Sequence, residues 1–139
     1  MGRRDVILLD THILVRYAAG DRKLGKRAIR SIDSALRKSE LAVSAISFWE
    51  VAMLVEKRRL KLQSAPIAFR ALALRQGIYE YPVDGEIAIR SAELTALHAD
   101  PADRIIAATA ISAGATLITA DAQLLGAQLA GLRVQDGTR

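Results

Sequence analysis

Near the start of the chain stands the stretch Val6-Ile7-Leu8-Leu9-Asp10-Thr11-His12, in which four apolar residues run directly into an acid. A short, unbroken apolar run is typical of a strand that a parallel sheet buries on both faces. In such a sheet, ligands bind in the crevice outside the carboxyl ends of the strands, and Asp10 comes at that end of this strand. The stretch therefore predicts a parallel sheet with a carboxylate at its functional edge.

The rest of the chain alternates short apolar runs with helical patterns, which indicates an α/β fold with a parallel sheet. Further strands are predicted at 41–44, 78–83 and 115–119, with a weak one at 132–134. Helices are predicted at 11–20, 24–38, 47–59, 66–76, 84–97 and 103–113. The 139 residues fit one domain, which we expect to span 1–139 around a central sheet of four to five strands.

The composition narrows the chemistry that is available. Cysteine is absent, which excludes a disulfide framework, a thiol nucleophile, a cysteine-ligated zinc and an iron–sulfur cluster. The two histidines, His12 and His98, are too few for a three-histidine zinc site and make a serine–histidine triad a poor fit. If the protein is an enzyme, carboxylates are its main catalytic groups.

Charge is distributed unevenly along the chain. Residues 1–75 hold 16 Lys and Arg against 7 Asp and Glu, whereas residues 76–139 hold 4 against 8. The net charge of +5 and the pI near 10.0 favour an anionic partner such as nucleic acid, although an ordinary solvated basic surface fits them equally well. No apolar stretch is long enough for a signal peptide or a transmembrane helix, so we expect a soluble cytoplasmic protein that does not contact a membrane.

Three further acids stand where strands end or helices begin. Asp121 follows the predicted strand 115–119 after one residue. Glu50 and Asp103 each stand near the start of a helix dense in apolar residues, where an ionised carboxylate is costly to bury unless it is paired or bound to a cation. Because right-handed crossovers place these positions at one edge of the sheet, we expect the three acids and Asp10 to converge.

Helix capping explains each of these acids well when it is taken singly. Ser47-x-x-Glu50 has the pattern of a capping box. Asp100-Pro101-Ala102-Asp103 has the pattern of an N-cap, a proline at N1 and an acid at N3. Asp121 could cap a short helix, and Asp10 could be a turn residue. Only the occurrence of all four acids at one edge favours a functional site.

If the four carboxylates converge, their repulsion has to be relieved. Each pair about 4 Å apart costs about 4 kcal/mol at an effective dielectric near 20. Either their pKa values rise or a divalent cation enters. Oxygen ligands without soft partners suit Mg²⁺ or Mn²⁺, and a metal pair held by carboxylates activates water for phosphodiester hydrolysis. These residues therefore predict nuclease chemistry.

At these residues the chain resembles the PIN-domain ribonucleases, especially the VapC-type toxins of bacterial toxin–antitoxin pairs. The stretches that carry the resemblance are Leu8-Leu9-Asp10-Thr11-His12, Ser44-Ala45-Ile46-Ser47-Phe48-Trp49-Glu50-Val51-Ala52, His98-x-Asp100-Pro101-x-Asp103-Arg104-x-Ile106-Ala107-Ala108 and Leu117-Ile118-Thr119-Ala120-Asp121. The resemblance implies a PIN-like three-layer α/β/α fold and an endoribonuclease that uses one or two Mg²⁺ or Mn²⁺ ions. It also implies a homodimer, an RNA substrate and a cognate antitoxin protein that inhibits the enzyme.

The resemblance assigns roles position by position. The metal-binding aspartates that it implies are Asp10, Asp103 and Asp121. Glu50 would complete the catalytic quartet, as a ligand directly or through water. The small polar residues that would hydrogen-bond these acids or a metal-bound water are Thr11, Ser47 and Thr119. Asp103 is preferred to Asp100 because the apolar helix follows it directly. Ala102 departs from the pattern, since many relatives carry an aromatic residue there, which bears on local packing.

Several other residues have two interpretations. His12 could orient the first acid or touch a phosphate, but packing at a helix start is favoured, and His98 is expected in a loop or a cap rather than as a base. Phe48 and Trp49 fall at core spacing, which favours packing over base stacking. The candidate phosphate contacts for RNA are Arg27, Arg30, Lys57, Arg58, Arg59, Lys61 and Arg104. Arg104 could instead pair with a neighbouring acid.

Two other functions fit parts of the sequence. A catalytically silent RNA-binding or adaptor protein could use the same fold, although the intact quartet argues against it. A phosphoacceptor signalling module also has an Asp at a strand end and a Mg²⁺ site. Such a module needs a second acid beside the first and a lysine at the last strand, whereas Asp10 is followed by Thr11 and no lysine occurs after Lys61.

Overall fold

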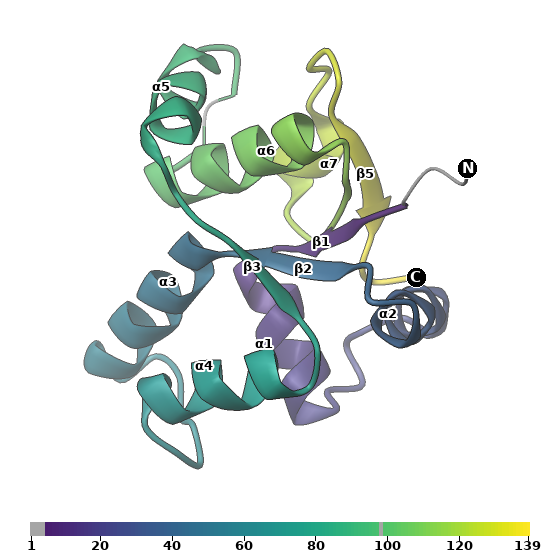
Figure 1. The fold of residues 1–139 in the computed structure, drawn as a ribbon, viewed down its shortest axis with the longest axis vertical. Coiled ribbons are helices and arrows are strands. Elements are labelled where there is room, and N and C mark those ends of the chain that lie inside the picture. Colours follow the sequence, from purple (N-terminus) through teal and green to yellow (C-terminus); the bar gives the residue numbers. More distant parts are fainter. Residues whose placement is uncertain (1–4, 98) are drawn as a thin grey trace.

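The computed structural model describes residues 5–97 and 99–139, which form one five-stranded sheet with helices on both faces (Figure 1). All strand pairs are parallel, and the order across the sheet is β3-β2-β1-β4-β5. The strands are β1 (Ile7–Leu9), β2 (Leu41–Ser44), β3 (Tyr79–Tyr81), β4 (Thr116–Thr119) and β5 (Arg133–Asp136). The predicted α/β class and parallel sheet are confirmed.

The helices alternate with these strands along the chain. Within the described residues they are α1 (Thr11–Ala19), α2 (Lys26–Arg37), α3 (Ala45–Glu56), α4 (Pro66–Arg75), α5 (Gly85–Glu93), α6 (Pro101–Ala113) and α7 (Ala122–Gly126). None of these helices is long and apolar enough to span a bilayer. Their bounds lie within a few residues of the predicted ones, except that α5 ends four residues before the predicted position 97.

The apolar run of β1 supplies both faces of the sheet. Leu9 packs in a buried cluster with residues of α1, α2 and α4, whereas Leu8 packs in a second cluster with residues of α6 and α7. Figure 1 shows α5 and α6 on one side of the sheet and α1, α2 and α4 on the other. Helix α3 contributes Phe48 to the first cluster and Ile46 to the second. The three-layer arrangement therefore has two separate cores.

Strand β1 lies in the middle of the sheet. Leu8 pairs with Ala42 of β2 on one side and with Leu117 of β4 on the other. The chain passes from β1 through β2 to β3 at one edge and then returns to β4 and β5 on the opposite side of β1. This reversal between β1 and β4 is the point at which such a sheet opens a crevice at the carboxyl ends of its strands.

The start of α3 differs from the prediction in a way that matters for the site. Ser44, at the end of β2, has an extended backbone, and its hydroxyl accepts a hydrogen bond from the Ile46 amide at 3.2 Å. Because this N-cap stands three residues before the predicted one at Ser47, α3 begins at Ala45. The capping box predicted for Ser47 and Glu50 is therefore wrong. Both residues lie inside α3.

Candidate active site

Asp10 stands between the end of β1 and the start of α1, and its carboxylate is held on both oxygens. Oδ1 accepts a hydrogen bond from the Ile13 amide at 2.9 Å, which makes Asp10 the N-cap of α1. Oδ2 accepts a hydrogen bond from the Thr119 hydroxyl. The residue is only 5% exposed. Burial raises the pKa of Asp10, and the two hydrogen bonds oppose that rise.

Thr119 links two of the acids at the end of β4. While its hydroxyl donates to Asp10, the same oxygen accepts a hydrogen bond from the amide of Asp121 at 3.0 Å. The Asp121 carboxylate accepts from the Gln123 and Leu124 amides, at 2.8 and 3.2 Å, and so caps α7 as the capping interpretation expects. Thr119 is fully buried, so it fixes the geometry of this corner from inside.

Thr11, Ser47 and Glu50 form a second linked group between α1 and α3. The Thr11 hydroxyl donates to Oε1 of Glu50 at 2.5 Å, and the Thr11 and Ser47 hydroxyl oxygens are hydrogen-bonded at 3.0 Å. One hydroxyl has one proton to donate. While Glu50 is ionised and accepts the hydrogen bond from Thr11, the Ser47 hydroxyl has to donate to the Thr11 oxygen. Ser47, which has no role as a cap, thus supports the side chain that orients Glu50.

Asp103 stands in the first turn of α6, after the N-cap Asp100. The Asp100 carboxylate accepts a hydrogen bond from the Asp103 amide at 2.9 Å, as the predicted cap requires. The Asp103 carboxylate is half-buried and accepts no hydrogen bond from the described residues. Its pKa is raised to about 7, first by burial and then by the negative charges of Asp100, Glu50, Asp121 and Asp10.

The same electrostatic effects connect the other acids. Burial raises the pKa of Glu50, and the charges of Asp100 and Asp10 add to that effect. The charge of Asp121 likewise adds to the raised pKa of Asp10. The structure therefore brings the four predicted acids into range of one another, although two of them follow β1 and β4 and the other two stand in α3 and α6. The convergence is a property of the fold, because no two of these acids are close in sequence.

This donor set matches a hard divalent cation in its chemistry. The groups that face one another are carboxylates and hydroxyls, the ligands that Mg²⁺ and Mn²⁺ prefer, and a cation among them would relieve their repulsion. Among residues 5–97 and 99–139, no three Asp, Glu or His side chains are already spaced as metal ligands. The acids therefore lie within electrostatic range of one another rather than in contact.

The aromatic and histidine predictions have mixed outcomes. Phe48 packs against the core and meets Phe69 edge-to-face at 6.3 Å between ring centroids. Trp49 is 56% exposed, so the core role expected for it is wrong, because it stands on the face of α3 opposite the fully buried Val51. His12 is exposed rather than packed. Its charge partly opposes the rise that burial causes in the pKa values of Asp10 and Glu50. His98 lies outside the described residues.

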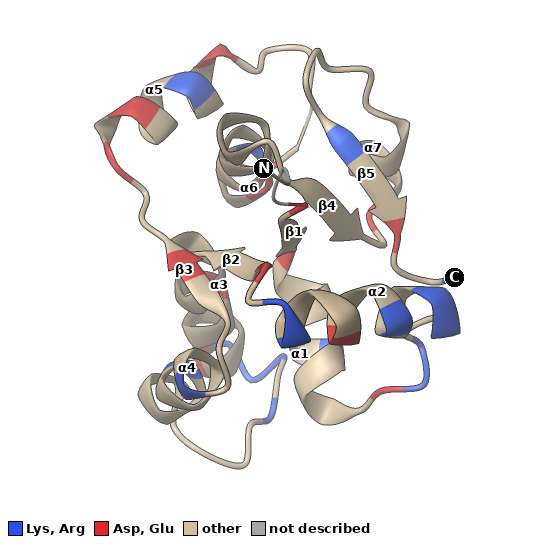
Figure 2. Cartoon of the chain, turned by 45° about the vertical axis from the view of Figure 1, so that its right-hand side comes forward, with Lys and Arg blue, Asp and Glu red and all other residues tan. Residues whose placement is uncertain are grey.

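Six of the seven predicted phosphate contacts are exposed, in two groups and a neighbouring loop, and the seventh is the exception (Figure 2). Arg27 and Arg30 are on α2, whereas Lys57, Arg58 and Arg59 follow the end of α3, about 10 Å along that helix from Glu50. The ion pairs of the described residues involve none of these five side chains. Both groups are therefore free of internal neutralisation. Lys61 lies in the loop that follows, and Arg104 is the exception.

Two features of the site were not predicted from the sequence. The sequence favours Asp103 over Asp100, yet the charge of Asp100 acts on both Glu50 and Asp103, which makes it a fifth acid of the site. Arg104 is half-buried, and its Nε donates to the carbonyl of Leu97 at 3.0 Å rather than to an acid. The sequence signal for the first was the spacing of Asp100 and Asp103; no signal indicated the second.

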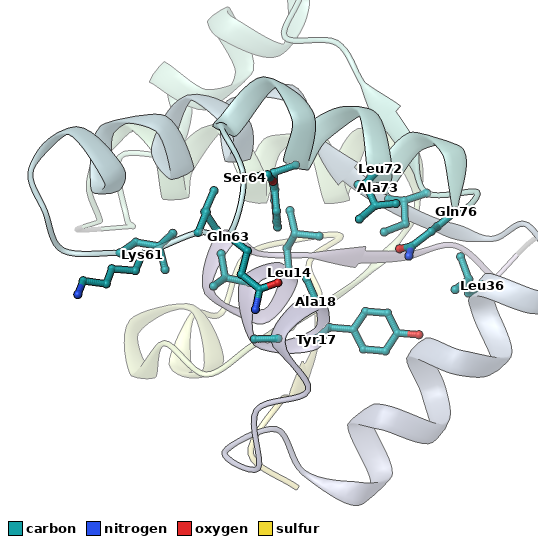
Figure 3. Close-up of a pocket in the computed structure, with 16 residues that line it drawn as sticks. Leu14, Tyr17, Ala18, Leu36, Lys61, Gln63, Ser64, Leu72, Ala73 and Gln76 are labelled. Carbon is teal, nitrogen blue, oxygen red and sulfur yellow. The ribbon is translucent and has the colours of Figure 1, made fainter.

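A separate apolar groove of about 840 Å³ lies between α1, the end of α2, the loop 60–64 and α4 (Figure 3). Leu14, Tyr17, Leu36 and Leu72 are among its lining residues, and none of the site's acids lines it. Its chemistry suits apolar side chains rather than phosphate. The groove is therefore a second surface, distinct from the acidic edge of the sheet.

Comparisons with known proteins agree with this architecture. A ribonuclease of Mycobacterium tuberculosis, VapC22, is 34% identical over 119 residues, which cover 85% of this chain and 88% of that protein. A toxin–antitoxin complex from Klebsiella pneumoniae has a similar chain, with 25% identity, a TM-score of 0.60 and coverage of 91% and 94% of the two chains. VapBC2 from Rickettsia felis, solved with a promoter DNA fragment, shares the fold at 18% identity and a TM-score of 0.70, over 94% and 98%.

The family profile of the PIN domain matches residues 7–127, a range that includes β1 and all four predicted acids. The match therefore spans the sheet reversal, both cores and the acidic edge. On this match and the 34% identity over most of its length, the chain belongs to the PIN-domain family.

Proposed function

We propose that the protein is an endoribonuclease that depends on Mg²⁺ or Mn²⁺ and acts as the toxin of a toxin–antitoxin pair, with residues 1–139 as a single domain. The observation that carries the proposal is the convergence of four carboxylates at one sheet edge, where burial and neighbouring negative charges raise the pKa values of Asp10, Glu50 and Asp103. Family membership and the similarity to a VapC ribonuclease support RNA as the substrate. The basic groups on α2 and after α3 suit a polyanion.

The residues divide the work of such a site. Asp10, Asp103 and Asp121 would hold one or two ions, and Glu50 would complete the set directly or through water. When bound, Mg²⁺ or Mn²⁺ supplies a water of lowered pKa and stabilises charge on the phosphate oxygens. Thr119 holds the Asp10 carboxylate, and Thr11 holds that of Glu50. Hydrolysis then needs no covalent intermediate with the protein.

The test compares two aspartates that both cap the N-terminus of a helix. Asp10 and Asp84 are both N-caps whose carboxylates accept a hydrogen bond from a helix amide at 2.9 Å. Asp84, however, caps α5 and is not among the acids whose charges raise the pKa of Asp103. Asn keeps the cap in either case. We expect Asp10→Asn to abolish Mn²⁺-dependent cleavage of single-stranded RNA, Asp84→Asn to retain it, and EDTA to stop it. Undiminished cleavage by Asp10→Asn would contradict the residue assignment.

A catalytically silent RNA-binding protein is the second candidate, favoured by one observation. No three acids of the described residues are already spaced as metal ligands. The same assay separates the candidates, because a silent protein would bind RNA with and without EDTA and cleave it in neither case. The phosphoacceptor function has no comparable support, since the lysine that it needs is missing from the sequence after Lys61.

The partner of the proposed toxin would be an antitoxin protein. A similar chain has been solved in a toxin–antitoxin complex, which supports this class of partner. We expect the groove of Figure 3 to receive apolar side chains of the antitoxin. Ala18 is exposed on its wall, so Ala18→Arg should weaken the complex and leave RNA cleavage unchanged. Ile89→Arg, at an exposed apolar residue of α5 outside the groove, is the matched control.

Two measurements check the remaining partner proposals. Expression of the chain should arrest growth, and co-expression with a small protein encoded beside it should restore growth. The homodimer that the resemblance implies stays a prediction, which sedimentation of the purified chain would check. A monomer that cleaves RNA at full rate would contradict the dimer and leave the ribonuclease proposal standing.

A further inference from the structure

Residues 94–97 and 99–100 stand between α5 and α6, just before Asp103. Among them, Leu97 is 3% exposed and packs in the same buried cluster as Ile106 and Ala107 of α6. The Leu97 side chain is therefore anchored in the core. Its carbonyl oxygen is a fixed point close to the start of α6.

Arg104 uses this fixed point. Its Nε donates to the Leu97 carbonyl at 3.0 Å, and its own amide donates to the Asp100 carbonyl at 3.2 Å. Arg104 is thus hydrogen-bonded to Leu97 through its side chain and to Asp100 through its main chain. Although an acid precedes it in the sequence, Arg104 forms no ion pair within 4.0 Å in the described part of the chain. The guanidinium donates to the backbone carbonyl of Leu97 instead.

Asp103 needs such support because its own side chain has none. The Asp103 carboxylate accepts no hydrogen bond from the described residues, whereas Asp10, Thr119 and Glu50 are tied to one another or to neighbouring hydroxyls. The surrounding carboxylates repel it. Its position therefore depends on where the first turn of α6 is held.

We propose that Arg104 is a positioning residue: its guanidinium ties the first turn of α6 to the core at Leu97 and so keeps Asp103 among the other carboxylates. This role rests on the ribonuclease function proposed above, in which Asp103 holds a metal ion. It replaces the phosphate contact expected from the sequence. A lysine cannot replace Arg104, because the planar guanidinium sets the direction of the Nε donor, whereas an ammonium is a point charge on a flexible stem.

The first experiment uses the metal-free protein and needs no activity. Amide hydrogen exchange is measured in Arg104→Ala, Arg104→Lys and, as a control, Arg90→Ala on exposed α5. We expect both Arg104 variants to exchange the amides at positions 97, 103 and 104 roughly tenfold faster, and the amides of β1 at an unchanged rate. A tenfold change is the size expected from the loss of one charged hydrogen bond. Exchange that matches the Arg90→Ala control would overturn the proposal.

The second experiment separates positioning from phosphate contact. Binding of Mn²⁺ alone is measured by calorimetry, and cleavage of single-stranded RNA is followed at several salt concentrations. We expect Arg104→Lys and Arg104→Ala to weaken Mn²⁺ binding about threefold to tenfold and to lower kcat, with KM and its salt dependence unchanged. Unchanged Mn²⁺ binding with a raised KM and a salt slope smaller by about 1 would instead assign Arg104 to a phosphate and overturn the proposal.

The two proposals fail in different ways. If the unsubstituted protein neither binds Mn²⁺ nor cleaves RNA, the ribonuclease function fails, and the exchange experiment still decides whether Arg104 holds the first turn of α6. If the unsubstituted protein binds and cleaves but the Arg104 variants behave like Arg90→Ala, the positioning role fails alone.

Discussion

The hydroxyl of Thr119 donates a hydrogen bond to the carboxylate of Asp10, a residue 109 positions earlier in the chain. The same oxygen accepts from the Asp121 amide. Parallel pairing of β1 with β4 brings these groups together, with Leu9 opposite Ile118. One buried hydroxyl thereby orients two acids of the proposed metal site.

Replacement of this hydroxyl tests its structural weight. Thr119→Val keeps the shape but leaves a buried carboxylate oxygen and the Asp121 amide without a partner, so we expect the free energy of unfolding to fall by roughly 2–3 kcal/mol. Thr119→Ser, which keeps the hydroxyl, should lose about 1 kcal/mol or less. Urea denaturation gives both values. A valine variant as stable as the serine variant would show that the bond contributes nothing.

The raised pKa of Asp103 makes stability depend on pH. The pKa is about 7 in the folded protein against an ordinary 3.8, so the folded state binds the proton more tightly than the unfolded chain. The resulting stabilisation is complete below about pH 4 and is lost as the pH rises through 7. In EDTA, we expect Asp103→Asn to lose less stability than the unsubstituted protein between pH 5 and pH 8, by on the order of 2 kcal/mol. Equal losses would contradict the raised pKa.

Divalent ions should reverse this loss. At pH 8 the carboxylates are ionised, so Mg²⁺ or Mn²⁺ should raise Tm, by an amount equivalent to about 2.7 kcal/mol when the free ion is at a hundred times its Kd. At pH 5.5 the shift should shrink, because protonated Asp103 is no longer a ligand. Thermal scans with added EDTA check reversibility. An identical shift in Asp103→Asn would place the ion elsewhere.

Gly25 has a steric constraint at the start of α2. A Cβ built there would lie 2.2 Å from the main-chain carbonyl carbon of Arg139, whose oxygen accepts from the Arg27 amide at 2.7 Å. Backbone cannot move aside as a side chain can, so we expect Gly25→Ala to cost roughly 1–3 kcal/mol. Gly85→Ala is the control, because a Cβ at Gly85 meets nothing within 4 Å. Chemical denaturation of both variants decides the matter, and equal stabilities would exclude the close approach.

Trp49 and Val51 stand two residues apart on opposite faces of α3. Trp49 is 56% exposed, whereas Val51 is fully buried. We expect Trp49→Ala to change the free energy of unfolding by less than about 1 kcal/mol, and Val51→Ala to lower it by roughly 2 kcal/mol. A large loss on removal of Trp49 would restore the packing role that the sequence suggested. A small loss of stability with weaker RNA binding would favour base stacking instead.

Local patterns along the chain are enough to predict the elements and the sheet edge at which the acids stand. The run 6–9 specifies a strand buried on both faces, and its two faces fill two cores, because successive side chains of a strand point to opposite sides. Asp100 and Pro101 start α6 for the same local reason that the sequence indicated. Such signals act within a few residues, which is why they can be read from the sequence without the rest of the fold.

The contacts that hold the acids in place come from the way the elements pack together. The hydrogen bond from Thr11 to Glu50 and the one from Thr119 to Asp10 depend on which strands lie side by side. The exposure of Trp49 and the hydrogen bond from Arg104 to the Leu97 carbonyl depend on how the helices pack against their neighbours. These contacts join residues that only the strand order β3-β2-β1-β4-β5 and the packing of the helices bring together, so no local pattern encodes them.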